Sequence, residues 1–386
     1  MRRLFITICA IETVPYLDFG MDTVLFDAPL YEHSYRKFMD ASNKLGLDVE
    51  FVRASNCEIA NTKSSINPGL EDIVIFASPL AFLARSKDIE GAIEYVIKSD
   101  VGYATVGSLR SLYMAIGQGK MLSGGEIGSP ADFVAAMSNS GAISFPAHFC
   151  DGEKSVPLTK LDYLKRIEEY RQEFLDYLIM SGVEIDLRDG ITVSPISEIH
   201  RGVKISPNVV IDSLTKIYDN TVIGPFSYIK NSEIGENCVI SSSRIINSTL
   251  ENNIKVDAYS NIIGESHILS NTSIGAYTEL KGTSVGMECE IGSHVCLSRC
   301  TVGKGGIVGN GVISVSFDKN KRDSFVKIGD SAIIGNGATL IAPLSIGRGA
   351  FVGAGSAITD DIPSGALGIA REYQSNHNGW AKRKVK

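Results

Sequence analysis

The sequence has 386 residues, a formal net charge of −7 and a pI near 5.5. This length suffices for two domains with a hydrophobic core each, while the acidic balance argues against nucleic acid as a partner. No apolar run approaches the length of a membrane span, so we expect no membrane partner. The seven cysteines are scattered as reduced thiols would be, which favours a cytoplasmic location.

The first half of the chain mixes strand and helix signals. The stretch "MRRLFITICAIE" (1–12) imitates a signal peptide, but no cleavage site of small residues follows, and we interpret it as a first strand. "DIVIF" (72–76) predicts a buried strand. "DIEGAIEYVIK" (88–98) places its apolar residues on one helical face. Strands that alternate with helices predict an α/β layer domain.

The strongest helix signal lies at 159–182. Thr159 and Asp162 form a capping-box pattern, and a glycine stands at the end. The apolar stripe expected to face the core consists of Leu161, Leu164, Ile167, Phe174 and Leu178. Because the sequence pattern changes after this helix, we expect two domains, at 1–185 and 186–386.

From about residue 200 onward, apolar residues recur every six positions. One series comprises Ile328, Ile334, Leu340, Ile346, Val352 and Ile358, and another comprises Val256, Ile262, Ile268, Ile274 and Leu280. Six is a whole number of β pleats, so the same strand face recurs at each step. Glycine often follows the apolar residue, which suits a corner that turns sharply or takes positive φ. The period is typical of a hexapeptide parallel β-helix, in which three hexads form one triangular coil of roughly 18 residues.

Within the repeats, "CEIGSHVCLSRC" (289–300) gathers three cysteines and a histidine, and so raises the question of a metal or catalytic site. The residues expected to fill the core of a coil here are Cys289, Ile291, Val295, Leu297 and Cys300. Cys296 and His294 then lie on other edges or faces. Four ligands do not converge in this arrangement, and we predict no metal site.

The end of the chain carries a more specific resemblance. "LIAP" (340–343), "GAGS" (353–356), "GALGIAR" (365–371) and "GWAKRK" (379–384) resemble the C-terminal end of the bifunctional UDP-N-acetylglucosamine pyrophosphorylase/glucosamine-1-phosphate N-acetyltransferase family. The resemblance is strongest over roughly 182–386. It implies a left-handed β-helix, a nucleotidyltransferase-like (Rossmann-like) N-terminal domain, assembly as a homotrimer, and acetyl-CoA as co-substrate.

The N-terminal domain lacks what the first activity of this family requires. A sugar-nucleotide pyrophosphorylase needs a glycine-rich loop for phosphates and a carboxylate for Mg²⁺. Here no glycine occurs before Gly20, and Ser78 stands where the resemblance requires the metal aspartate. We therefore expect the pyrophosphorylase activity to be lost, which makes a role for Mg²⁺ doubtful.

The resemblance assigns residues to the second activity. The motif "IGAYTELK" carries the family's Glu and Lys onto Glu279 and Lys281, and a lysine there is suited to a substrate phosphate. At the C-terminal end, the positions that contact the cofactor in the family are Asn336, Ala354 and Arg371. Glu279 and Lys281 have the alternative interpretation of exposed charges on a coil.

The chemistry of acetyl transfer needs a base, and the resemblance places the family's catalytic histidine on Ser293. His294 is one residue later and is our candidate base, with His267 as the alternative and a corner histidine without a chemical role as the competing interpretation. Other family positions also differ. No arginine stands near Ile263, and the family's tyrosine and Asn-Tyr pair become Cys296 and Ser316-Phe317.

Three functions therefore remain open. The first is an acetyl-CoA-dependent N-acyltransferase acting on an amino sugar phosphate or a sugar nucleotide. The second is a non-catalytic trimeric homologue with a structural or regulatory role. The third, disfavoured by the missing phosphate loop, is the ordinary bifunctional enzyme.

Overall fold

The computed structural model describes the chain at residues 3–8, 24–25, 28–53, 72–77, 81, 84, 86–99, 103–108, 111–118, 134–135, 147–149, 160–212, 214–315, 324–372 and 374–377. Its contacts divide the chain into two compact units. One comprises residues 1–177 with 194–196, and the other comprises 178–193 with 197–386.

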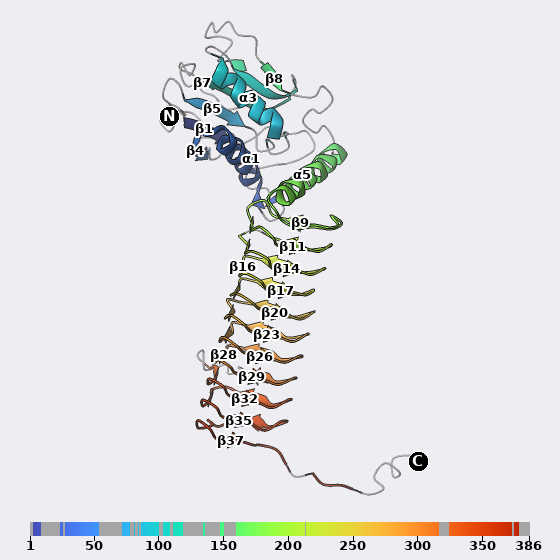
Figure 1. The fold of residues 1–386 in the computed structure, drawn as a ribbon, viewed down its shortest axis with the longest axis vertical. Helices are drawn as coiled ribbons and strands as arrows, with labels where there is room; N and C mark the ends of the chain where they lie inside the picture. Colours follow the sequence, from blue (N-terminus) through green and yellow to red (C-terminus); the bar gives the residue numbers. More distant parts are fainter. Residues whose placement is uncertain are drawn as a thin grey trace, which may run out of the picture. The chain divides into compact units, whose positions relative to one another are not determined.

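A six-stranded mixed sheet forms the centre of the first unit (Figure 1). Its strands lie in the order β4 (Asp48–Arg53), β1 (Arg3–Ile8), β5 (Ile73–Ala77), β7 (Ser111–Gln118), β6 (Ala104–Ser108) and β8 (Ala147–Phe149). β1 is parallel to β4 and β5, whereas β7 is antiparallel to β5 and β6. A separate hairpin pairs β2 (Val24–Leu25) with β3 (Ala28–Pro29). The strands predicted at the N-terminus and at 72–76 are both confirmed.

Two helices pack on this sheet. α1 (Leu30–Leu45) contacts β1 and β4, and α3 (Ser86–Lys98) contacts β5, β6 and β7. Of the predicted apolar face of α3, Ile89, Ala92, Ile93 and Val96 are fully buried, and Ile97 is partly buried. The first unit therefore has its own core and the α/β layer architecture that the alternating pattern predicts.

The third long helix, α5 (Lys160–Met180), forms where it was predicted, and Gly182 follows it with a φ of +98°. Its predicted stripe is wrong at the first turn, because Leu161 and Leu164 are 61% and 52% exposed. The buried face instead begins with Tyr163 and Tyr170. Tyrosine has an apolar ring and a polar tip, so a stripe defined by aliphatic residues alone overlooks it.

The second unit is a parallel β-helix with three sides, each a sheet of short strands (Figure 1). Side I contains β10 (Glu198–Ile199), β13 (Lys216–Ile217), β16 (Glu233–Ile234), β19 (Thr249–Leu250), β22 (His267–Ile268), β25 (Ser284–Val285), β28 (Cys300–Val302), β31 (Val326–Ile328) and β34 (Leu344–Ile346). Side II contains β11 (Lys204–Ile205), β14 (Val222–Ile223), β17 (Val239–Ile240), β20 (Lys255–Val256), β23 (Ser273–Ile274), β26 (Glu290–Ile291), β29 (Ile307–Val308), β32 (Ile333–Ile334), β35 (Phe351–Val352) and β37 (Leu367–Gly368). Side III contains β9 (Thr192–Val193), β12 (Val210–Ile211), β15 (Tyr228–Lys230), β18 (Arg244–Ile246), β21 (Asn261–Ile263), β24 (Glu279–Lys281), β27 (Cys296–Ser298), β30 (Ile313–Val315), β33 (Thr339–Ile341) and β36 (Ala357–Ile358).

The hexad residues point into the helix, as the period predicts. Every apolar residue of the two six-residue series is buried, with at most 4% of its surface exposed. The residues of the 289–300 segment predicted to fill the core are buried as well, namely Cys289, Ile291, Val295, Leu297 and Cys300. Burial of a side chain of this size contributes about 1.5–3 kcal/mol, so the inward column stabilises the coils along their whole length.

The glycines after the apolar residues turn out to serve close packing rather than positive φ. A Cβ added at Gly275 would lie 2.6 Å from the backbone nitrogen of Ser293 on the next coil. The left-handed residue comes two positions later, at Tyr277 with a φ of +58°. The hexad glycine therefore lets one coil approach the next, and the turn itself is made by another residue.

Candidate active site

One corner of the β-helix, between sides II and III, collects most of the predicted site residues. We call the left-handed residues at this corner the corner column. Each lies two positions before the first paired residue of a side III strand. In order along the helix, the corner column comprises Gly190, Asn208, Phe226, Ser242, Tyr259, Tyr277, His294, Gly311, Gly337 and Gly355, all with positive φ.

His294 is the end of a stack of three rings in this column. The rings of Tyr259 and Tyr277 lie 5.1 Å apart between centroids, with an interplanar angle of 25°. The imidazole of His294 lies 5.1 Å from the Tyr277 ring and is nearly parallel to it, at 2°. His294 is exposed, so the stack fixes the plane of its ring while solvent still reaches it. Beyond His294 the next member of the column is Gly311, which has no side chain to cover the imidazole.

The ring stack occupies an unfavourable backbone conformation. The left-handed region costs a residue other than glycine roughly 1–2 kcal/mol, and asparagine is the usual substitute for glycine there. Tyr259 and Tyr277 nevertheless adopt φ values of +64° and +58° and remain 64% and 56% exposed. Ring stacking contributes about 0.5–1.5 kcal/mol per pair, which offsets part of this cost. The column therefore presents two large aromatic rings to solvent.

Glu279 and Lys281 lie beside the stack on the outer face of side III. Both are exposed, and they pair in register with Cys296 and Ser298 of the next coil. Partial burial raises the pKa of the Cys296 thiol, and the carboxylate of Glu279 raises it further. Because Cys296 follows His294 by two positions, the structure brings the predicted base together with the predicted Glu and Lys.

Two further residues extend this face, and sequence reasoning missed both. Arg244 and Asn261 pair in register with each other, and Asn261 pairs with Glu279. The sequence showed no arginine close to Ile263, but Arg244 lies on the neighbouring strand. The side-chain oxygen of Asn261 is buried and has no hydrogen-bond partner. The sequence signal that identifies them is a spacing of 17 to 18 positions, which separates residues paired on successive coils.

The predicted cofactor residues lie farther along the same corner. The side-chain oxygen of Asn310 accepts a hydrogen bond from the Ser293 backbone N–H at 2.8 Å, and that of Asn336 accepts one from the Asn310 N–H at 2.9 Å. One coil farther, the guanidinium of Arg371 donates to the backbone oxygen of Ala354 at 3.1 Å. Asn336, Ala354 and Arg371 are therefore grouped next to the glycines of the corner column.

The alternative base, His267, lies apart from this corner. It stands on side I and lines an open polar groove of about 420 Å³ together with Lys216, Glu233 and Glu265. His294 and His267 are thus on different sides of the helix, and only His294 accompanies the other predicted residues.

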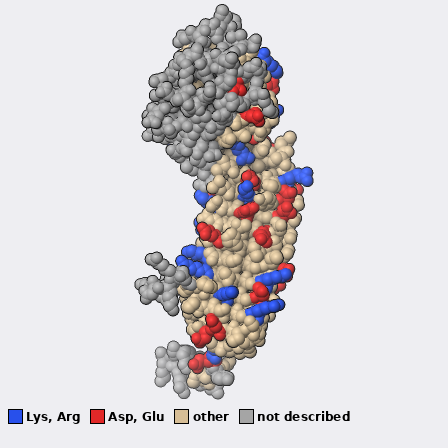
Figure 2. All heavy atoms as spheres, turned by 90° about the vertical axis from the view of Figure 1, so that its left-hand side faces the viewer, with Lys and Arg blue, Asp and Glu red and all other residues tan. Residues whose placement is uncertain are grey.

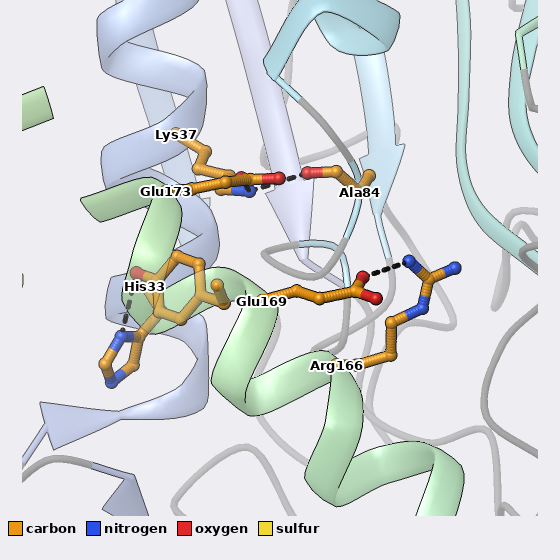
Figure 3. A network of polar contacts seen from close by, with 7 residues as sticks. His33, Lys37, Ala84, Arg166, Glu169 and Glu173 are labelled. Atoms are coloured by element: carbon orange, nitrogen blue, oxygen red, sulfur yellow. Dashed lines mark hydrogen bonds and ion pairs between the residues drawn. The ribbon is translucent and has the colours of Figure 1, made fainter. Parts of the chain in front are cut away.

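The first unit holds a buried polar cluster between α1 and α5 (Figure 3). The ammonium of Lys37 donates to the backbone oxygen of Ala84 at 2.6 Å and to Glu173 at 2.9 Å. Burial lowers the pKa of Lys37, and Glu173 opposes this effect. A ring nitrogen of His33 lies 3.1 Å from the Tyr170 hydroxyl. These groups satisfy one another, so the cluster holds the two helices together.

Several predicted features fall outside the described residues. Gly20, Ser78 and the Ser316-Phe317 pair belong to this group. In the part of the chain that the structure describes, no group of three or more His, Cys, Asp or Glu side chains is placed to hold a metal ion. No helix among the described residues is both long and apolar enough to cross a membrane.

The strand pairing and the left-handed corner column define a hexapeptide-repeat β-helix protein. A family model described as GlmU-like, C-terminal hexapeptide, matches residues 226–296. The bifunctional protein GlmU of Fervidobacterium nodosum is 35% identical over 214 residues, which cover 55% of this chain and 47% of that protein. GlmU of Listeria monocytogenes serotype 4a is 37% identical over 208 residues, which cover 52% and 45%. The predicted resemblance is thus confirmed, although the chain spans about half the length of these relatives.

Comparison with solved structures gives partial matches. An Arabidopsis UDP-N-acetylglucosamine acyltransferase matches 47% of this chain and 70% of its own, with 18% identity and a TM-score of 0.39. AntD, an N-acyltransferase from Bacillus cereus solved with dTDP and coenzyme A, matches 42% and 90%, with 22% identity and a TM-score of 0.24. The predicted fold class, an α/β N-terminal domain followed by a left-handed parallel β-helix of hexapeptide repeats, is confirmed.

Proposed function

We propose that the protein is an acetyl-CoA-dependent N-acyltransferase whose acceptor is an amino sugar phosphate or a sugar nucleotide. The observation that supports the proposal is the alignment of His294, Glu279 and Lys281 with Asn336 and Arg371 on successive coils along one corner of the β-helix. Homology to bifunctional GlmU proteins supports the reaction class. A cytoplasmic location, drawn from the scattered cysteines, belongs to the same proposal.

The residues have distinct roles in the proposed reaction. The acceptor amine attacks the thioester carbonyl, a C–N bond forms, and the C–S bond then breaks to release the thiol of coenzyme A. His294 takes the proton that the amine loses, because its ring edge is exposed and its plane is fixed by Tyr277. Lys281 pairs with the phosphate of the acceptor, and its neighbour Glu279 orients the amine.

The cofactor lies along the glycine part of the corner. Gly337 and Gly355 leave open space where a side chain would stand. Asn336 and Arg371 flank this strip and offer a side-chain amide and a guanidinium to the amides and phosphates of coenzyme A. The acceptor side and the cofactor side of the corner meet at His294.

Titration with acetyl-CoA tests the proposal. We expect binding in the wild type and a loss of about 10- to 150-fold in Arg371→Ala, since a charge-assisted hydrogen bond contributes about 1.5–3 kcal/mol. Arg348→Ala is the matched control, because Arg348 is an exposed arginine of the same region outside the corner column. Acetyl-CoA with glucosamine 1-phosphate or a nucleotide-linked amino sugar should then release free thiol. A wild type that binds no acetyl-CoA contradicts the proposal.

The non-catalytic homologue is the second candidate function, and one observation favours it. The family position of the base is Ser293 here, and His294 is held face-on against Tyr277. A protein that binds acetyl-CoA but transfers its acetyl group to no amino sugar phosphate or sugar nucleotide fits this second candidate.

A further inference from the structure

The corner column lacks one ring where its aromatic residues otherwise continue. Phe226 stands two coils before Tyr259, and Ser242 occupies the position between them. Phe226 is 71% exposed at a φ of +59°, and in the described part of the chain no ring stacks on it. No stacking partner therefore offsets the free-energy cost of its left-handed backbone, in contrast to Tyr277.

The spacing of the column suits one inserted planar ring. Successive coils lie about 4.8 Å apart, so Phe226 and Tyr259 are separated by about 10 Å along the axis. The rings already stacked in this column lie 5.1 Å apart, and a ring at the Ser242 level would have one such neighbour on each side. Ser242 is small enough to leave that level open, and its hydroxyl offers a hydrogen bond.

Groups suited to a phosphorylated ligand lie directly beside this level. Arg244 follows Ser242 by two positions and is exposed on side III. Its guanidinium lies 5.9 Å from the Tyr228 ring centroid, and no carboxylate among the described residues forms an ion pair with it. An exposed arginine and two flanking rings match a phosphate and a base.

Resting on the proposed function, we propose that the acceptor is held through a nucleoside diphosphate. Its base stacks at the Ser242 level between Phe226 and Tyr259, and its diphosphate pairs with Arg244 as well as with Lys281. Three coils, or about 14 Å, separate Ser242 from His294 along the column. A nucleotide-linked amino sugar extends over several coils and so reaches both places. A sugar 1-phosphate is too short to contact both, so the site selects a sugar nucleotide as its acceptor.

Binding of UDP and dTDP to the full-length protein, measured by calorimetry without an acyl donor, tests this proposal. Phe226→Asn and Tyr259→Asn remove the rings without straining the backbone, because Asn208 occupies the same column at a φ of +58°. Ser242→Tyr fills the open level with a ring of the chain itself. We expect each to weaken nucleotide binding by about 5- to 100-fold, the range that base–aromatic stacking contributes. Arg244→Ala should weaken the diphosphate but not the free nucleoside.

The control is Leu214→Asn, an exposed left-handed residue at another corner, which should bind UDP and dTDP as the wild type does. Absence of binding of either nucleotide to the wild type overturns the proposal, even if acetyl transfer to glucosamine 1-phosphate persists and the proposed function stands. Weakening of acetyl-CoA rather than UDP or dTDP by Phe226→Asn and Tyr259→Asn also overturns it, because the level would then take the adenine of the cofactor. Nucleotide binding without any binding of acetyl-CoA would instead contradict the proposed function.

Discussion

At the scale of single residues, His294 combines a constrained plane with an accessible edge. Its face lies against Tyr277 and its backbone is left-handed. A one-residue shift along a regular strand turns a side chain to the other face, so the offset from Ser293 predicted a redirected histidine. At a corner the rule is weaker, and the ring remains next to the strand that carries Cys296. This placement keeps His294 the candidate base.

Replacement of His294 should lower kcat by roughly 10²–10⁴-fold, the usual contribution of a positioned base. His294→Asn is the variant of choice beside His294→Ala, because asparagine tolerates the left-handed backbone. Acetyl-CoA affinity, measured by calorimetry, should change little since Asn336 and Arg371 lie elsewhere along the corner. An active enzyme whose kcat survives both substitutions would leave His294 with a stacking role only.

Cys300 should give the protein an alkaline limit of stability. Burial raises the pKa of its thiol to about 12 from the ordinary 9.0. A pKa that is higher in the folded than in the unfolded state contributes stability that is complete below pH 9 and is lost as the pH rises toward 12. We expect Cys300→Ala to flatten the decline in the free energy of unfolding between pH 9 and 12 by up to about 1.4 kcal/mol per pH unit. Urea titrations of both proteins at several pH values measure this difference, and parallel declines would contradict it.

At the scale of structural elements, each coil uses two kinds of corner residue. One is crowded and takes ordinary φ, as at Gly335, where an added Cβ would lie 2.5 Å from the backbone nitrogen of Ala354. The other is open and left-handed, as at Gly337, where nothing lies within 4 Å of the added atom. The first residue sets how closely the coils pack, and the second turns the chain into the next side.

This difference predicts that substitutions at the two glycines of one coil have different effects on stability. Gly335→Ala should destabilise the protein by about 1–3 kcal/mol, the cost of forcing a group into a packed site, and should weaken acetyl-CoA binding because Ala354 is displaced. Gly337→Asn should retain the melting temperature, since asparagine accepts positive φ. Thermal unfolding and an acetyl-CoA titration of the two variants test this, and equal destabilisation would contradict it.

At the scale of the whole molecule, charged and apolar side chains are distributed unevenly over the surface of the β-helix. Figure 2 shows acidic and basic side chains interspersed over one of its faces. Side II near the C-terminal end is different, because its outward positions are apolar on four successive strands. These residues are Ile307, Ile333, Phe351 and Leu367, and between 36% and 61% of each is exposed. A contiguous apolar stripe of this kind is typical of a contact surface.

The stripe supports the homotrimer implied by the resemblance. Light scattering should give three times the chain mass of 41.5 kDa at micromolar concentration. Phe351→Asp places a charge within the stripe and should shift the mass toward that of one chain, while Lys327→Asp on side I should not. A wild-type protein that is monomeric at this concentration would rule out the trimer.

The first unit should not turn over nucleoside triphosphates. The sequence lacks a glycine before Gly20 and an acid at Ser78, and the resemblance requires both features for a phosphate loop and a Mg²⁺ ligand. We expect no pyrophosphate release from UTP and N-acetylglucosamine 1-phosphate with Mg²⁺ present. Measurable Mg²⁺-dependent release would restore the bifunctional enzyme as the best description.

The sequence by itself determined the β-helix and its core. A period of six brings the same face of a strand inward at each step, so the burial of residues such as Ile268, Ile274 and Leu280 follows from the sequence alone. The helices α3 and α5 followed from their amphipathic patterns. The resemblance to one family also pointed to residues along this corner, namely Glu279 and Lys281 on one coil and Asn336 and Arg371 on later coils.

Only the tertiary structure decided which residues face one another across the coils. Arg244 follows its partner Tyr228 by 16 positions, whereas Glu279 follows Asn261 by 18. The coil length thus varies, and an error of one residue moves a side chain to another face. For this reason the ring stack of Tyr259, Tyr277 and His294, the open level at Ser242 and the position of Arg244 were not evident from the period. The inward positions can be predicted despite the varying coil length, because every side of each coil has its own apolar residue. An outward site forms only where strand pairing brings its residues onto neighbouring positions of successive coils.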